Sequence, residues 1–446
     1  NFINQGDVNG EFDISGTMDN PALKGTLNIR DSYINNVGIY DSDVKIGYVE
    51  GDFSIDQMVL RRNGINMFAG SGGFYSDSSK VDFNMSGRKI DLNVLVQSLT
   101  EYDNLLVAEA DANLRLIGAL DDLQITGDIE VGKGQFSRFA FDSIYATLGR
   151  SQEHDGSSAG ISLKEFSVNR KNQFTINGDG FIPFSSLDTM DIRLNGTGNL
   201  LSILPEITGF FKDTRSDGEW DVHFTGSPGN LSIASGHVNL QNGFLELGAV
   251  APKINDISVN LIVEPDGFVK VDYIHGEVKN REFSFFNNKA SEVCCQRNLI
   301  PFVVPDLGLD FGVWSIRTTD KGVPLHIPAL MEKGEIGNFE FIGRDSCENF
   351  YVAGPASNPV VRGKIKLRNV NLMYPFAETP GMAESPVTRL LQLVEWNVLA
   401  VAGKDTRYEK EIPSGVDKVY VNLLLDSGVG GLDFSGIIDD KSFAIE

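Results

Sequence analysis

Residues 53–74 read FSIDQMVLRRNGINMFAGSGGF, and residues 161–181 read ISLKEFSVNRKNQFTINGDGF. The two glycines spaced by one residue near the end of each stretch align at an offset of 108 residues. The runs that follow, VDFNMSG from Val81 and MDIRLNG from Met190, align at an offset of 109. Because such self-similarity is typical of repeat architectures, the sequence predicts a tandem array of one β unit.

Apolar and polar residues alternate with a period of two along much of the chain. The alternation runs through 81–85, 190–194, 220–224, 238–240 and 365–368. Successive side chains of a strand face opposite sides, so each run has one apolar and one polar face. This pattern favours half-buried strands of the antiparallel or solenoid type over the uniformly apolar strands of a parallel α/β sheet.

A second feature recurs four times as strand, glycine, short turn, glycine and strand. It begins at Gly16, Gly118, Gly226 and Gly354 and twice contains Asn-Pro. No linker rich in Pro or Ser separates the copies, which predicts one continuous sheet. We therefore expect an elongated, curved, all-β fold, a taco-shaped half-pipe built from four modules at 1–100, 101–215, 216–345 and 346–446.

Helical signals are few and short. Residues 91–99, 200–211 and 385–394 could each form a short helix, placed as a cap or lip on the sheet. Residues 286–326 interrupt the repeat and have no place in it.

The charge balance excludes several classes of partner. The chain has 446 residues and a net charge of −23, so we expect no nucleic-acid binding and no adhesion to an anionic membrane surface. No apolar run reaches the ~18–20 residues of a membrane-spanning helix. The chain begins at Asn1 without an initiator Met, and we expect it to be a soluble segment of a longer protein whose anchor lies outside it.

Motifs for catalysis or metal binding are absent from the sequence. The glycines at 69–74 lack the lysine of a phosphate loop, and the five histidines are scattered without metal-ligand spacing. Adjacent Cys294 and Cys295 with a distant Cys347 do not form a metal or redox motif, which leaves either free thiols or one disulfide to Cys347. We predict that the protein is not an enzyme and needs no cofactor or metal.

The apolar face of the strands is therefore the candidate functional surface. Two layers could close on it as an ordinary core, or a curled sheet could leave an apolar trough that holds acyl chains. The 29 Phe against 11 Tyr and 3 Trp favour a lining without polar groups. The predicted lining residues are Phe83, Met85, Leu114, Leu116, Phe174, Ile176, Ile192, Leu194, Val222, Phe224, Val238, Leu240, Ile365 and Leu367.

The later part of the chain resembles a known family. The stretch PLHIPALMEKGEIGNFEFIG from Pro324 and the stretch NFYVAGPASNPVVRGKIKLRNVNLMYPF from Asn349 resemble the carboxy-terminal region of the TamB family of AsmA-like envelope proteins. The turn element at Gly16 resembles that family's repeated NPxxxGxLxLxxG feature. Residues 394–411 are similar to a stretch near the family's end, although Asp405 and Thr406 depart from it. The most distinctive part is 320–410.

This resemblance implies an elongated β structure with an apolar groove, in the periplasm of a diderm bacterium and anchored in the inner membrane in the full-length protein. It implies phospholipid as the bound species, conducted between inner and outer membranes. The alternative that it implies is assembly of outer-membrane proteins with a partner of the Omp85/TamA type, related to BamA, through an exposed sheet edge. A β-solenoid adhesin is a further alternative, and an enzyme ranks last.

Overall fold

The computed structural model of the chain is nearly all β, as the alternation predicts. Two short α-helices are described, α1 (Leu92–Leu99) and α2 (Leu204–Ile207), with 3-10 turns η1 (Ser76–Ser78) and η2 (Leu200–Ile203). The structure describes residues 3–445 except 35–36, 100–103, 120–121, 138, 150–159, 184–187, 208–210, 228–229, 248–252, 291–292, 294–298, 305–308, 327–330, 332–334, 345–347, 356–357, 373–393, 415–416, 426–430 and 438–443.

The chain divides into two compact units. The first unit comprises Asn1–Gly196 and the segment His223–Leu231, and the second comprises Thr197–Val222 and Ser232–Glu446. The four modules predicted from the repeat stay a prediction, because they rest on the sequence pattern. Each unit is described below by itself.

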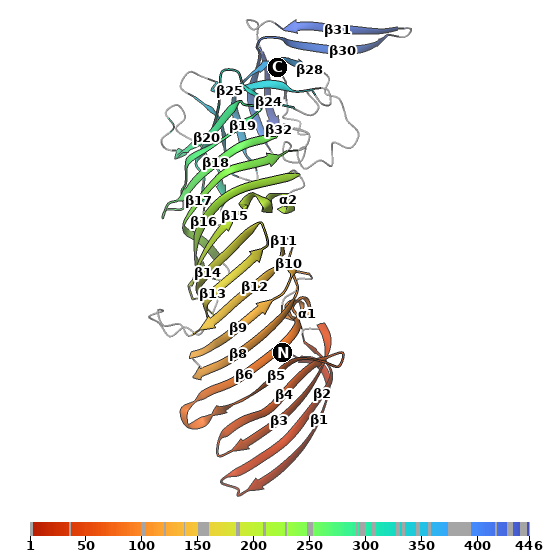
Figure 1. The fold of residues 1–446 in the computed structure, drawn as a ribbon, viewed down its shortest axis with the longest axis vertical. Coiled ribbons are helices and arrows are strands. Elements are labelled where there is room, and N and C mark those ends of the chain that lie inside the picture. The colour runs from red at the N-terminus through yellow and green to blue at the C-terminus, as the bar shows by residue number, and fades with distance from the viewer. Residues whose placement is uncertain are drawn as a thin grey trace. The chain divides into compact units, whose positions relative to one another are not determined.

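In the first unit, consecutive strands pair antiparallel as the rungs of one twisted sheet (Figure 1). The register links each strand to the next from β1 to β14. The strands are β1 (Ile3–Gly16), β2 (Pro21–Ile34), β3 (Val37–Val49), β4 (Asp52–Arg62), β5 (Ile65–Tyr75), β6 (Lys80–Asp91), β8 (Glu109–Ala119), β9 (Asp122–Val131), β12 (Ser143–Gly149), β13 (Gly160–Arg170) and β14 (Phe174–Pro183), followed by β15 (Met190–Gly198). A small sheet joins β7 (Leu106–Val107), β10 (Gly134–Phe136) and β11 (Phe139–Phe141).

The repeat seen in the sequence has the same register in both copies. In the first copy Ile55 lies opposite Gly72 and Met58 opposite Gly70, with a bulge between the two pairs. In the second copy the equivalent pairs are Leu163 with Gly180 and Phe166 with Gly178, again with a bulge between them. Each of these positions is shifted by 108 residues, so the sequence offset is also a structural offset.

The four recurring turns share one backbone conformation. Gly16, Gly118, Gly226 and Gly354 all have positive φ, at 91°, 130°, 114° and 85°. A β-carbon at Gly16 or Gly226 would lie 2.3 Å from the carbonyl oxygen of the Asn four residues later. Only glycine tolerates this combination of left-handed backbone and close approach, which explains why the turn recurs with glycine at its first position.

Helix α1 covers one end of the apolar face of the first unit. Asp91 caps it, because its Oδ1 accepts hydrogen bonds from the backbone N–H groups of Asn93 and Val94 at 3.1 and 3.3 Å. Val94 then packs in a buried cluster with Tyr40, Met67, Ile90, Ala110, Ala112, Val131 and Phe141. The helix predicted at 91–99 is therefore confirmed, and it closes only part of the face.

The strands of the second unit mostly pair antiparallel with their neighbours. They are β16 (Asp213–Ser227), β17 (Asn230–Glu246), β18 (Ile254–Val263), β19 (Val269–Val278), β20 (Glu282–Asn288), β21 (Val303–Val304), β22 (Leu309–Asp310), β23 (Val313–Thr318), β24 (Val323–Leu325), β25 (Gly337–Ile342), β26 (Phe350–Ala353), β27 (Val360–Arg368), β28 (Val370–Leu372), β29 (Glu395–Ala402), β30 (Thr406–Ser414), β31 (Asp417–Leu425), β32 (Gly431–Ile437) and β33 (Ala444–Ile445). Two pairs, β27 with β29 and β28 with β30, are parallel.

The structure answers the sequence predictions for 200–211, 385–394 and 286–326 only in part. Within their described part, residues 200–211 form η2 and then α2, which begins at Leu204 and is four residues long. The helix predicted at 385–394 falls almost entirely outside the described residues, and so do Cys294, Cys295 and Cys347. The unplaced segment 286–326 contains the end of β20 and the short strands β21 to β24.

Ion pairs cross-link neighbouring strands on the polar face of the first unit. Asp43 on β3 accepts hydrogen bonds from Arg30 of β2, at 2.6 Å, and from Arg61 of β4. The hydrogen bonds from Arg61 and then Arg30 lower the pKa of the Asp43 carboxyl from its ordinary value of 3.8. Arg115 of β8 binds Asp82 of β6 through two hydrogen bonds of 2.8 and 2.5 Å, which lowers the pKa of Asp82.

The equivalence of the two repeat copies is testable at Gly72 and Gly180. A β-carbon at Gly72 would lie 2.1 Å from the Asp82 carbonyl oxygen, and one at Gly180 would lie 2.2 Å from the Asp191 carbonyl oxygen. Gly72→Ala and Gly180→Ala should each lower the free energy of unfolding by about 1–3 kcal/mol, because the next strand must move. Urea unfolding measures the loss.

The matched control is Gly132→Ala, where an added β-carbon would have its nearest contact at 3.7 Å. That variant should unfold like the parent. A loss at only one of the two glycines would contradict the structural equivalence of the copies.

A second prediction concerns acid stability at Asp43. Because the pKa of Asp43 is lower in the folded chain than in the unfolded chain, its contribution is present above pH ~4 and is lost as pH falls through the lowered folded pKa. Asp43→Asn should therefore flatten the decline of stability below pH ~4. Chemical denaturation across pH 2–7 would measure this slope. Asp77→Asn, in the exposed turn η1, serves as the control. An unchanged acid slope in Asp43→Asn would refute the assignment.

Candidate functional site

The register aligns apolar side chains across the whole sheet of the first unit. Residues directly opposite each other in neighbouring strands point to the same face. One chain of such partners, called here the central row, consists of Gly10, Leu27, Val44, Met58, Gly70, Met85, Leu114, Gly127, Leu148, Leu163 and Gly180. Every member is apolar or glycine.

Two further rows flank the central row on the same face. The Phe83 row consists of Phe12, Gly25, Ile46, Ile55, Gly72, Phe83, Leu116 and Ile125. The Ala112 row consists of Val8, Ile29, Ser42, Leu60, Phe68, Gly87, Ala112, Ile129, Ala146, Phe166 and Gly178. Ser42 is the single polar member. The three rows together form an apolar strip without a charged residue.

Burial along this strip is graded. Near α1 the side chains are closed off, with Ile90 at 2% and Ala110 at 3% exposure. Away from α1, Met58, Met85 and Leu114 of the central row are half-buried. Phe12, at the β1 end, is 45% exposed. A well-packed core would bury all of these side chains, so most of the strip retains contact with solvent.

The opposite face of the same strands is polar. Between the central-row positions lie Asn84, Ser86, Asn113 and Arg115, all exposed. His223 follows the same rule, because its Nε2 lies 3.0 Å from Oδ1 of Asp191. The alternation seen in the sequence therefore separates an apolar from a polar face.

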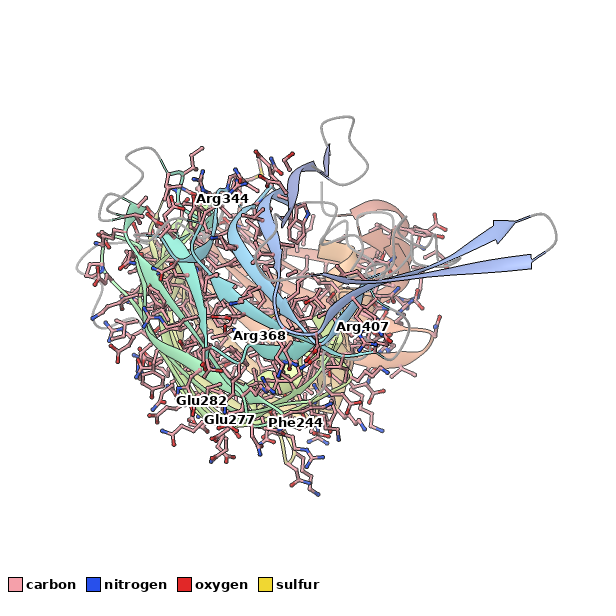
Figure 2. All side chains as sticks on the ribbon, turned by 90° about the horizontal axis from the view of Figure 1, so that it is seen from above. Phe244, Glu277, Glu282, Arg344, Arg368 and Arg407 are labelled. Atoms are coloured by element: carbon pink, nitrogen blue, oxygen red, sulfur yellow. The ribbon has the colours of Figure 1, made fainter. Side chains whose placement is uncertain are left out.

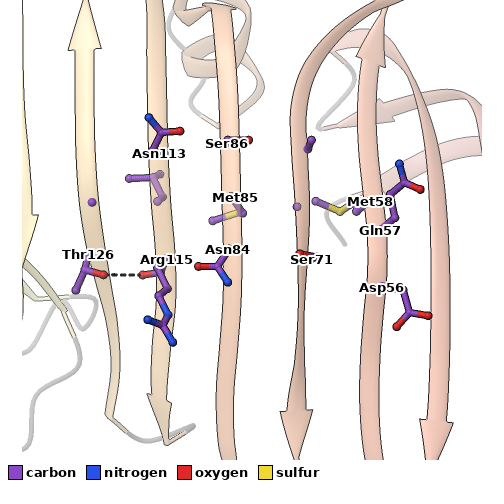
Figure 3. Close-up of a pocket in the computed structure, with 14 residues that line it drawn as sticks. Asp56, Gln57, Met58, Ser71, Asn84, Met85, Ser86, Asn113, Arg115 and Thr126 are labelled. Atoms are coloured by element: carbon purple, nitrogen blue, oxygen red, sulfur yellow. Dashed lines mark hydrogen bonds between the residues drawn. The ribbon is translucent and has the colours of Figure 1, made fainter.

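The depression shown in Figure 3 crosses β4, β5, β6, β8 and β9 and has a volume of about 510 Å³. Five central-row residues line it: Met58, Gly70, Met85, Leu114 and Gly127. The other lining residues are neighbours of these along their strands, among them Gln57, Ser71, Asn84, Asn113 and Thr126.

Eight of the predicted lining residues lie on the apolar face of the first unit. Seven of them, all but the buried Phe174, are half-buried, in agreement with the graded exposure of the strip. The eight are Phe83, Met85, Leu114, Leu116, Phe174, Ile176, Ile192 and Leu194.

The remaining predicted residues lie on β16, β17 and β27. Val222, Phe224 and Val238 are half-buried, and Leu240 is 3% exposed. Leu367 is buried in a cluster with Met331, Phe339, Val370 and Leu372, and Ile365 packs against this cluster. The face of β27 is therefore a closed core and differs from the open strip of the first unit.

Sequence reasoning missed Ile55, Met58, Leu163 and Phe166. In β4, Ile55 and Met58 are three positions apart but lie opposite Gly72 and Gly70, which are two positions apart, so β4 has a bulge between them. Strand β13 has the same bulge between Leu163 and Phe166. The bulge breaks the period of two, which hides these residues from an alternation search. Their recurrence at an offset of 108 is the signal that could have found them.

Two acidic side chains of the second unit point outward from their strands. Figure 2 shows Glu277 and Glu282, which lie directly opposite each other in β19 and β20, pointing outward. Phe244 is on this side too, with Lys253 Nζ 5.3 Å from its ring centre. Within the described residues, neither helix is long and apolar enough to cross a membrane, and no group of three or more His, Cys, Asp or Glu could hold a metal ion.

Comparison with known families identifies the first part of the chain. Residues 3–143 match the family described as the TamB C-terminal domain. The match begins in β1 and ends at the start of β12, so it covers the part of the apolar strip on β1 to β9 and leaves out its part on β12 to β14. The stretch 320–410, the most distinctive part of the sequence resemblance, lies outside the match.

Neither a curated protein nor a solved structure matches the chain. The resemblance to the TamB family is therefore supported in residues 3–143, where the family match includes the turn at Gly16. Residues 3–143 are similar to the TamB C-terminal domain, as the sequence resemblance predicts.

Proposed function

We propose that the apolar strip of the first unit lines a hydrophobic groove that conducts phospholipid by its acyl chains. The observation that carries the proposal is the central row with its two flanking rows, which hold no charged side chain and are only half-buried away from α1. Same-face residues along a strand are roughly 7 Å apart, so three rows give a strip about 14 Å wide. An acyl chain fits within that width.

Burial of a hydrocarbon chain on such a surface needs no polar motif. Each CH₂ group removed from water contributes about 0.8 kcal/mol. The favourable free energy is similar at each strand, because every strand presents Leu, Met, Phe, Ile or Gly to the same face. A chain could thus move from strand to strand without a deep energy minimum, as conduction requires.

The proposed setting follows from the family. The protein acts in the periplasm of a diderm bacterium, the full-length chain is anchored in the inner membrane, and lipid passes between the inner and outer membranes. The role is transport without catalysis, and phospholipid is the bound species.

A second candidate function is assembly of outer-membrane β-barrel proteins with a TamA/BamA-type partner. The match to the TamB C-terminal domain supports it. A free sheet edge can accept another strand by main-chain hydrogen bonds. Lipid copurification separates the two functions.

The lipid proposal is tested by a charge on each face of one strand. Met85→Glu places an unpaired carboxylate in the central row, where it opposes the passage of acyl chains. Ser86→Glu, one residue away, places the same carboxylate on the exposed polar face. Photo-crosslinking from position 114 to lipid should be lost in Met85→Glu and retained in Ser86→Glu, with both variants folded.

Native mass spectrometry of the purified protein supplies an independent readout. The parent should carry phospholipid, and Met85→Glu should carry less. Two results would overturn the proposal. In the first, the parent gives no lipid crosslink from position 114 and carries no lipid in the mass spectrum. In the second, Met85→Glu unfolds, and the variants Ile192→Arg and Phe224→Glu keep their lipid crosslinks.

A further inference from the structure

The apolar strip has hollows at its glycines, and neighbouring side chains lie in several of them. A β-carbon added at Gly25 would lie 2.2 Å from Cδ1 of Phe12, and one at Gly178 would lie 2.4 Å from Cδ2 of Leu194. One at Gly10 would lie 2.9 Å from both Leu27 and Phe12. The side chains in these places lie along the sheet over a bare backbone.

The arrangement at the middle of the strip involves Gly70 and Phe83. Gly72 lies directly opposite Phe83, and Gly70 is its diagonal neighbour. A β-carbon at Gly70 would lie 3.0 Å from both Cε1 and Cζ of Phe83. The far edge of the Phe83 ring therefore lies over Gly70, in the central row, although Phe83 starts from the flanking row.

A β-carbon at position 70 would require a neighbour to move by a few tenths of an ångström, and the branched side chain of Val would require a larger movement. The same β-carbon would also lie 3.0 Å from the Asn84 carbonyl oxygen, which belongs to the sheet ladder and cannot easily move. The Phe83 ring is the movable neighbour, because rotation about its side-chain bonds can lift it away from the sheet. Lifted, it would occupy the space above the central row between Met58 and Leu114.

We propose that Gly70 and Phe83 form a clearance-setting pair in the apolar strip: the hollow at Gly70 keeps the Phe83 ring flat, so that an acyl chain can pass above it. This inference rests on the proposed lipid conduction and names the residues that control it at β5 and β6. The flat ring of Phe83 then offers apolar contact area without protruding from the sheet into the path of the acyl chain. Gly70 is a positioning residue that acts through Phe83.

Strand β5 is suited to this role over its whole middle part. Its sequence from 69 to 73 is Ala-Gly-Ser-Gly-Gly, with Gly70 and Gly72 on the apolar face. Glycine in a strand interior costs stability, since it adds backbone entropy and packs no side chain. Glycines in a strand often mark a place where another group comes close to the backbone. In β5 that group is the ring of Phe83.

The test compares Gly70→Val, Phe83→Ala and the double variant. Lipid crosslinking is read from a photoreactive residue at position 116, directly opposite Phe83, and from one at position 27 on the distant β2. Gly70→Val should lower the yield at 116 by roughly fivefold and leave the yield at 27 unchanged. Phe83→Ala in the Gly70→Val background should restore the yield at 116, because the lifted ring is gone.

Ring orientation is measured without lipid by 4-fluorophenylalanine at position 83. Its fluorine NMR signal should show a larger solvent-isotope shift in Gly70→Val than in the parent, because a lifted ring is more exposed. Gly70→Ala, a smaller change, should give an intermediate shift if Gly70→Val folds poorly. Gly132→Val, at a position where an added β-carbon would have its nearest contact at 3.7 Å, controls for the substitution itself.

The outcomes separate this inference from the proposed function. A parent that gives no lipid crosslink at 116 or 27 overturns the lipid function. A parent that crosslinks lipid, with equal yield in Gly70→Val, overturns the clearance role of Gly70 alone. A reduced yield that Phe83→Ala fails to restore shows that the ring is not the obstacle, which also overturns it.

Discussion

Cross-strand register is the constraint on which the apolar strip depends. A strand that slipped by one residue would turn its whole apolar set to the other face. The hydrogen-bond ladder from β1 to β14 prevents this, and the strip survives even where the strands are irregular. In β4 the bulge between Ile55 and Met58 adds a residue but returns both side chains to the same face as Gly72 and Gly70. The bulges thus bend the sheet without breaking the separation of its two faces.

The same register explains the polar face and the charge of the protein. A chain with a net charge of −23 has strong self-repulsion. On the polar face of the first unit, arginines on neighbouring strands flank an aspartate, as Arg30 of β2 and Arg61 of β4 flank Asp43 of β3. These exposed pairs contribute little stability individually. Their consequence is positional, because all the charge stays on one side and none enters the apolar strip.

Much of this arrangement could be predicted from the sequence. Alternation at Phe83 and Met85 or at Ile192 and Leu194 is local information, and it identified the strands and their two faces. The turns at Gly16 and Gly226 were recognisable because a positive φ and a close carbonyl require glycine. The repeat offset carried over to the register unchanged, because each copy pairs with its own sequence neighbours.

The remainder depended on information that alternation does not contain. Bulges changed the spacing at Met58 and Phe166, so period-two reasoning passed over them. Whether an apolar face is open or closed depends on what later segments place upon it. Ile365 and Leu367 alternate like Phe83 and Met85, yet Met331, Val370 and Leu372 cover them. No property of the strand itself distinguishes the two cases.

That difference bears on how a lipid conduit could be built from one repeated pattern. In the first unit, α1 closes the apolar face near Ile90 and Ala110, while Met85 and Leu114 stay half-buried. In the second unit, Leu367 of β27 is buried among the chain's own apolar side chains, and Ile365 packs half-buried against the same cluster. Stability and lipid binding draw on the same hydrophobic surface, and a side chain that is fully packed cannot also contact lipid. An open strip must therefore be stabilised from elsewhere, and in the first unit the continuous backbone ladder and the cluster under α1 provide that support.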